Sequence, residues 1–249
     1  MSIVLAAVSG GMYEIGDDLP TLAEDPVRLA LVENQELLQM VKLGQAAVPI
    51  DLMTYRTEDG QPSVFLLHED RRQTMLAVFN WTEEPRGHAF TLADLMLPSG
   101  GSYAVSDVLH PDRSANFQAG RLDLKSQRAH SVRLLKIIDT SVPAAAPGVT
   151  ASVPVKAEVG TELEFSAGTA VDGVPAISYH WDFGDGTEAD GTAVIHAYTY
   201  ADTFNVRPSV KGVDGITASS SHRLLVTGTL PGKFVLLLNR RYIQPSDDK

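Results

Sequence analysis

Residues 179–187 read Tyr-His-Trp-Asp-Phe-Gly-Asp-Gly-Thr, and this stretch decides the fold of the C-terminal half of the chain. Trp181 and Phe183 are two residues apart, so both side chains lie on one face of a strand and anchor a core. The Gly-Asp-Gly that follows tolerates positive φ angles, which a tight turn after a strand needs. The stretch therefore predicts a strand and turn at the centre of a β domain.

The same alternation continues on both sides of this stretch. In residues 161–167 and 203–211, apolar side chains take one face and polar or charged side chains take the other. This period of two indicates sheets with one buried face and one solvent-exposed face. Pro208 has no N–H to give to a ladder, so we expect it where no hydrogen bond is needed. We predict a β domain over residues 151–228.

A second group of short β-like runs precedes it. Turns rich in Gly, Pro and charged residues separate the runs, which is typical of an antiparallel sandwich. The runs cover residues 64–68, 75–81, 88–92, 103–108 and 132–138. We assign residues 50–139 to this domain and residues 140–150 to a Pro/Ala linker. We expect residues 229–249 to be a tail or the start of a truncated further domain.

The N-terminal stretch has a different pattern. Residues 1–8 are apolar and predict a buried strand; they lack the basic start of a signal peptide. Asp25 and Asn34 are good N-caps and Gly44 suits a helix end, so helices are expected from residue 26 to 44. A lone strand–helix pair has no core of its own. We therefore expect residues 1–49 to be the last unit of a truncated (β/α)8 barrel, a fold of about 250 residues.

Composition bounds the function. The chain has 249 residues, a formal net charge of −11 and no cysteine. Disulfides, thiol nucleophiles and Cys-ligated zinc are excluded. Without a basic cluster or a long apolar run, we expect no nucleic-acid partner and no membrane partner. The predicted fold class is mainly β: two antiparallel β-sandwich domains, the second immunoglobulin-like, preceded by a terminal βα fragment of a barrel.

The C-terminal domain resembles a PKD domain. The family pattern reads WDFGDGT, then HxY, then a strand with Thr, an aromatic residue and Val. All three elements occur here in order, as residues 181–187, 196–198 and 203–206. Asp202 stands where the family usually has glycine before the last strand.

The N-terminal half resembles the end of an α-galactosidase-like glycoside hydrolase, of the family 27 and 36 type. Residues 5–11 and 16–19 resemble the last barrel strand and its loop, and residues 30–38 the helices after it. Leu76–Trp81 resembles the VxxFNW strand of the following domain, and Arg128–Leu135 its closing strand. Glu14, Ile15 and Pro20 depart from the commonest forms of the family.

The resemblance implies a retaining O-glycosyl hydrolase with an aspartate nucleophile and an aspartate acid/base, about 5 Å apart. In the family both belong to earlier barrel strands, so no residue of this chain inherits a catalytic role. The resemblance also implies an extracellular or periplasmic parent enzyme that acts on a galactoside or plant polysaccharide.

Three residues are candidates for sugar contact. Asp17 and Asp18 follow the predicted strand at what would be the catalytic rim of a barrel, where they contact sugar or cap the next turn. Tyr200 is a candidate stacking residue, whereas Trp181 lies on the core face. The carboxylates from Asp182 to Asp190 suit a turn better than a calcium site. No cofactor or metal is expected, because the seven histidines have no metal-ligand spacing.

These observations favour the accessory C-terminal portion of a secreted α-galactosidase-like hydrolase, inactive alone, with the PKD module as a spacer or polymer contact. The alternative is a non-enzymatic extracellular protein of β-sandwich modules that binds carbohydrate or mediates adhesion. A third class, the tail of a PKD-bearing secreted protease, does not account for the runs at residues 76–81 and 128–135.

Overall fold

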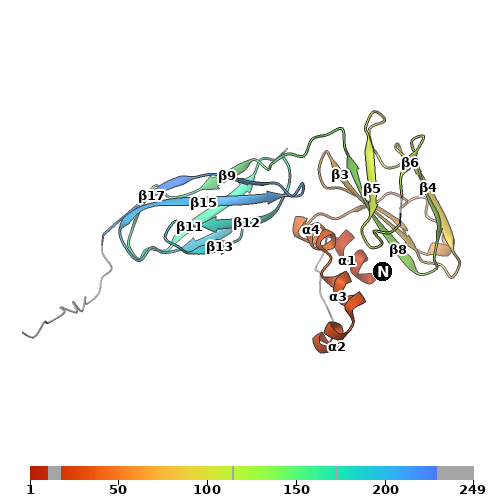
Figure 1. Ribbon diagram of the computed structural model, residues 1–249, viewed down its shortest axis with the longest axis horizontal. Coiled ribbons are helices and arrows are strands. Elements are labelled where there is room, and N and C mark those ends of the chain that lie inside the picture. The colour runs from red at the N-terminus through yellow and green to blue at the C-terminus, as the bar shows by residue number, and fades with distance from the viewer. Residues whose placement is uncertain (11–17, 114, 172, 229–249) are drawn as a thin grey trace, which may run out of the picture.

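The computed structural model describes residues 1–10, 18–113, 115–171 and 173–228. Two β domains follow one another along the chain, and a group of short helices packs against the first of them (Figure 1). The mainly β fold class predicted from the sequence is confirmed.

The helices begin and end where the capping residues predict. Asp25 Oδ1 accepts hydrogen bonds from the backbone N–H groups of Val27 and Arg28, each 3.1 Å long. Asn34 caps the next helix in the same way, and Gly44 ends it with a φ of +66°. The helices are α1 (Ser2–Val8), α2 (Leu19–Glu24), α3 (Pro26–Val32) and α4 (Gln35–Leu43).

The strand predicted over residues 1–8 is wrong, because these residues form helix α1. None of the described strands pairs with this segment, and an unpaired strand would leave its N–H and C=O groups without partners. A helix satisfies these groups within the segment itself. Its buried face, formed by Val4, Ala7 and Val8, packs on α4 and on the first sheet.

The first β domain is an antiparallel sandwich of two sheets. One sheet has the order β1-β2-β3-β8-β5 and the other the order β4-β7-β6. The first consists of β1 (Val48–Pro49), β2 (Val64–His68), β3 (Gln73–Asn80), β8 (Ser131–Asp139) and β5 (Tyr103–Asp107). The second consists of β4 (Arg86–Thr91), β7 (Arg121–Gln127) and β6 (Phe117–Gln118), and a short 3-10 helix spans Thr57–Asp59.

Strand β3 is buried at every position. Its odd-numbered residues from Met75 to Phe79 face the helices, and Leu76 and Val78 face the second sheet. Because successive side chains point to opposite faces, one strand contributes to two separate cores. The helical layer is therefore an integral part of this domain.

The second β domain has its own core between two sheets. Trp181 is fully buried there, and its ring lies 5.8 Å from that of Phe165. One sheet contains β10 (Lys156–Glu158), β17 (His222–Thr227), β15 (Asp202–Gly212), β12 (Ala176–Asp182) and β13 (Glu188–Asp190), with β16 (Thr217–Ser219) beside β15. The other contains β14 (Ala193–His196), β11 (Leu163–Thr169) and β9 (Val149–Ser152).

Pro208 lies in the longest strand of this domain, β15. One edge of β15 pairs with β17 up to Val206 and with β16 from Ser209 onward. Pro208 falls between the two pairings, where its carbonyl accepts a hydrogen bond from Ser220. The missing N–H therefore breaks neither ladder, as the sequence predicts.

The two β domains contact one another through a buried carboxylate. Asp214, in the turn between β15 and β16, has a side chain that is only 1% exposed. It accepts hydrogen bonds from Arg72 Nη1 and Gln73 Nε2, both 2.9 Å, and from the backbone N–H of Ala145, 3.0 Å. Helix α4 also contacts β12, so the two domains touch at a second place besides Asp214.

Replacing Asp214 with alanine is expected to release the second domain from the first. Three donors, one of them charged, lose a shared acceptor, which costs the interface about 2 kcal/mol. Small-angle X-ray scattering will show a larger radius of gyration, with the folding of each domain unchanged. Asp202→Ala is the control, because Asp202 is an exposed carboxylate at the opposite end of β15. An unchanged scattering profile for Asp214→Ala would contradict this role.

Glu69 is a second buried acid close to this interface, at the turn between β2 and β3. Burial raises the pKa of Glu69 to about 7. The charge of Lys136 acts against the rise, and the carboxylates of Glu36 and Asp70 add to it. Lys136 is already paired with Glu36 at 2.7 Å.

The Glu69→Gln variant is expected to gain relative stability as the pH rises. The folded pKa of Glu69 is above its unfolded value, so its ionisation between about pH 5 and about pH 8 destabilises the folded wild type, by up to roughly 3 kcal/mol. Glutamine avoids this cost. Chemical unfolding of both proteins across that range will show the difference growing with pH. A difference that does not change with pH would contradict the prediction.

Candidate functional site

Asp18 caps a helix in the structure. Its Oδ2 accepts hydrogen bonds from the backbone N–H of Thr21 at 3.2 Å and from the Thr21 hydroxyl at 2.7 Å. These bonds hold the pKa of Asp18 below its ordinary value. The capping alternative is thus observed for Asp18, and its sugar-binding role stays a prediction. Asp17, the other predicted residue, lies outside the described residues.

Tyr200 belongs to the second domain and is half exposed. Its ring meets Phe204 edge to face, with 5.2 Å between the centroids. Tyr198 is buried instead, and its hydroxyl donates to the Phe183 carbonyl at 3.0 Å. Burial raises the pKa of Tyr198. Tyr200 therefore offers an accessible aromatic surface, whereas Tyr198 and Trp181 hold the core.

The carboxylates near residue 185 stabilise a turn. Asp185 accepts from the Thr187 hydroxyl at 2.6 Å and lies 2.8 Å from His196 Nε2. Gly184 has a φ of +78°, and a Cβ there would lie 2.9 Å from the Asn205 carbonyl oxygen. Within the described residues, no three His, Asp or Glu side chains gather in a way that could hold a metal ion.

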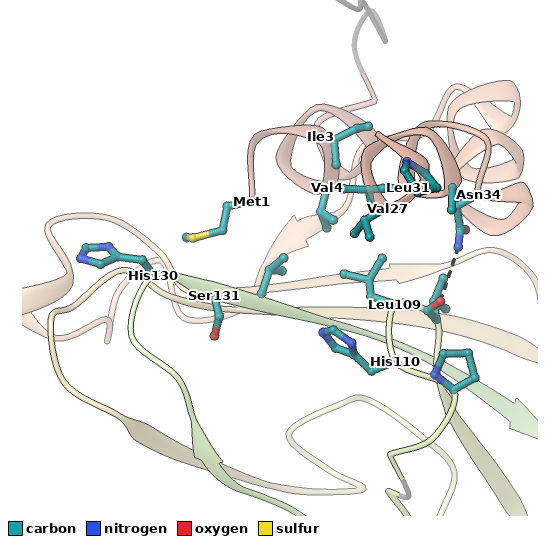
Figure 2. A pocket seen from close by; sticks show the side chains of 15 residues that line it. Met1, Ile3, Val4, Val27, Leu31, Asn34, Leu109, His110, His130 and Ser131 are labelled. Atoms are coloured by element: carbon teal, nitrogen blue, oxygen red, sulfur yellow. Dashed lines mark hydrogen bonds between the residues drawn. The ribbon is translucent and has the colours of Figure 1, made fainter. Parts of the chain in front are cut away.

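An apolar groove runs between the helices and the first sandwich (Figure 2). Its volume is about 670 Å³. Asn34 bridges it with a hydrogen bond of 3.4 Å from its Nδ2 to the Val108 carbonyl. The lining includes Met1, Val4, Val27, Leu31, Leu109 and Val132.

Sequence reasoning did not identify this groove. Its lining comes from helices α1 and α3, the N-cap of α4, a loop after β5 and the start of β8. No local pattern marks the groove, because these segments are far apart in the sequence. The groove also brings His110 and His130 to one side, although the sequence shows both as scattered histidines. His130 Nε2 lies 3.0 Å from a carboxylate oxygen of Glu83. The apolar lining suits packing rather than bond-breaking chemistry.

Comparison with known proteins identifies the second domain. The family model described as PKD domain matches residues 144–227. Residues 144–227 form a PKD domain. The match begins inside the predicted linker 140–150, and β9 of the PKD domain begins at Val149.

One curated relative is a protein called microbial collagenase, from Vibrio alginolyticus. It is 30% identical over 89 residues, which are 35% of this chain and 11% of the relative. The chain thus spans about a tenth of that protein. The solved PKD1 domain of the Vibrio cholerae metalloprotease PrtV is 19% identical, with a TM-score of 0.27, and covers 33% of this chain and 96% of that one.

A solved structure also matches the N-terminal part. Alpha-galactosidase I from Mortierella vinacea is 17% identical, with a TM-score of 0.43, over 56% of this chain and 34% of that one. None of the helices in the described part of this chain has the length and apolar character that a membrane crossing needs.

Proposed function

We propose that this chain is the accessory C-terminal portion of a secreted glycoside hydrolase of the α-galactosidase type. In this proposal the first sandwich stabilises a catalytic barrel. The PKD domain either acts as a spacer between the enzyme and a polymer or contacts the polymer itself. The parent enzyme acts on a galactoside or plant polysaccharide outside the cell or in the periplasm.

The pairing of β3 with β8 is the observation that carries the proposal. The two strands overlap the two runs that resemble the family. They are neighbours within the sheet, with Ala77 opposite Leu134. The motif residue Asn80 is fully buried, and its Nδ2 donates to the carbonyls of Gln127 and Arg128 at 3.2 and 2.9 Å. Trp81 Nε1 donates to the Pro62 carbonyl at 3.0 Å. The motif therefore has a structural role that suits an accessory domain.

The apolar groove supports the same proposal. One face of the first sheet is covered by helices that leave this groove beside them, and Val27 is 78% exposed at its edge. Exposed apolar surface of this kind marks a site of protein contact. We propose that the barrel of the parent enzyme covers it.

The 249-residue chain is expected not to hydrolyse aryl α-galactosides, whereas a longer form that includes a barrel does. The reason is that both aspartates of the retaining mechanism belong to the barrel in this family. Release of the aryl alcohol, followed by absorbance for both proteins, is the measurement. Turnover by the 249-residue chain would overturn the accessory role.

A Val27→Asp substitution separates barrel packing from folding of this chain. Aspartate suits the first turn of α3, so the melting temperature of the 249-residue chain will not change. In the longer form the new carboxylate lies in a buried contact with the barrel, so the melting temperature of that form falls. Val171→Asp is the control, because Val171 is fully exposed in the PKD domain. Equal melting temperatures for the two longer variants would contradict packing at the groove.

The exposed ring of Tyr200 favours a second function, a non-enzymatic extracellular protein that binds carbohydrate or mediates adhesion. Aromatic rings present large, rigid faces on which apolar faces of ligands pack. If this function holds, the chain is retained on an insoluble plant glycan without hydrolysis, and Tyr200→Ala lowers retention about tenfold. Tyr55→Ala, an exposed tyrosine of the first domain, is the matched control. Retention that is the same in both variants would rule out stacking on Tyr200.

A further inference from the structure

A polar hollow lies at one end of the first sandwich. Its volume is about 540 Å³. It is formed by the loop between β5 and β6, the end of β7 with the turn after it, and Arg133 on β8. Four of the residues that line it are cations, namely Arg113, Lys125, Arg128 and Arg133. We call it the basic hollow.

Arg133 is the buried cation of the basic hollow. Its side chain is 9% exposed, and its Nε donates to Asp107 Oδ2 at 2.9 Å. Asp107 also accepts from the backbone N–H groups of Leu109 and His110, so its acceptor capacity is largely used. Arg133 Nη2 is buried and has no acceptor among the described residues. An unsatisfied, buried donor on a charged group is costly, so the site favours an additional acceptor.

The other three cations add a positive field. Arg113, Lys125 and Arg128 are exposed, and the described part of the chain provides none of them with an ion pair. Two acids also line the hollow, Asp112 and Asp123, of which Asp123 lies 3.8 Å from Arg121. Cations therefore outnumber acids here by four to two, although the whole chain carries a net charge of −11.

Gln127 contributes a buried acceptor to the hollow that has no donor within the described residues. Its Nε2 donates to the carbonyls of Val78 and Ser131 at 2.9 and 3.0 Å, which fixes the orientation of the amide. Its Oε1 is buried and receives no hydrogen bond from the described residues. The preceding residue, Ser126, has a φ of +49°, and a non-glycine residue in this region is often held there for function. The site thus lacks both an acceptor, at Arg133, and a donor, at Gln127.

We propose that the basic hollow binds the anionic group of an acidic carbohydrate, a carboxylate or a sulfate ester. The oxyanion accepts hydrogen bonds from the guanidinium of Arg133 and lies in the field of the three exposed cations. A hydroxyl group of the same sugar donates to Gln127 Oε1. An inorganic anion such as sulfate accepts from Arg133 but has no hydroxyl to donate to Gln127 Oε1. The carbohydrate nature of the ligand rests on the proposed function, whereas anion binding does not.

The proposal is tested by calorimetric titration of the complete chain with galacturonate, galactose 6-sulfate, inorganic sulfate and neutral galactose. The two acidic sugars are expected to bind, more weakly at high salt, and galactose is not. Tighter binding of galacturonate would indicate a carboxylate site, and tighter binding of galactose 6-sulfate a sulfate-ester site. Binding of inorganic sulfate as tight as that of both sugars would overturn the carbohydrate part and leave an anion site. Binding of no anion would overturn the whole proposal, while the glycosidase proposal is judged separately by hydrolysis.

Matched double variants locate the site. Lys125→Gln with Arg128→Gln removes two cations from the hollow and is expected to weaken binding at least about tenfold. Lys156→Gln with Arg223→Gln removes the same charge from exposed positions of the PKD domain and should leave binding unchanged. All four side chains are exposed, so both proteins will fold. Equal weakening in the two variants would reveal a general charge effect and overturn the assignment to this hollow.

Discussion

Strand β3 is hydrogen-bonded along both edges and buried on both faces, and the first domain depends on it. A strand with no exposed position requires a covering layer on each side, because its apolar side chains alternate between the two. The second sheet supplies one layer and helices α1 and α4 supply the other. The helices are short, and such helices gain most of their stability from tertiary packing. The sheet and the helices therefore stabilise each other, and the apolar groove remains where the helical layer is incomplete.

The PKD domain has an independent core, so its position relative to the first domain is set by polar contacts. Asp214 brings together a charged side chain, a neutral side chain and a backbone donor from two segments of the chain. A buried carboxylate left without these donors would be costly, which disfavours partial separation of the domains. Under the proposed function, this contact would fix the orientation of the PKD domain as well as its distance from the first domain.

The sequence predicts the strands and the helix caps well where local chemistry decides them. Gly184, Asn34 and Gly44 have the conformations that their residue types indicate, and β2 has the predicted bounds. Residues 1–8 were predicted wrongly, because a short apolar run does not distinguish a strand from a buried helix. Asp214, the apolar groove and the basic hollow were beyond prediction. Each depends on side chains from distant segments, and the unsatisfied atoms of Arg133 and Gln127 exist only after packing is complete.

The acidic surface and the basic hollow have complementary effects on binding. At physiological salt the field of an exposed charge falls off over about 8 Å. The charges nearest the recess, four cations and two acids, therefore outweigh the overall charge of −11 there. A long polyanion that lies along the surface meets repulsion over most of its length. A single anionic group that enters the recess meets a buried guanidinium and an amide oxygen, both without partners within the described residues. The arrangement therefore selects for an isolated acidic sugar over a dense run of charge, because only the isolated group gains the contacts without the surrounding repulsion.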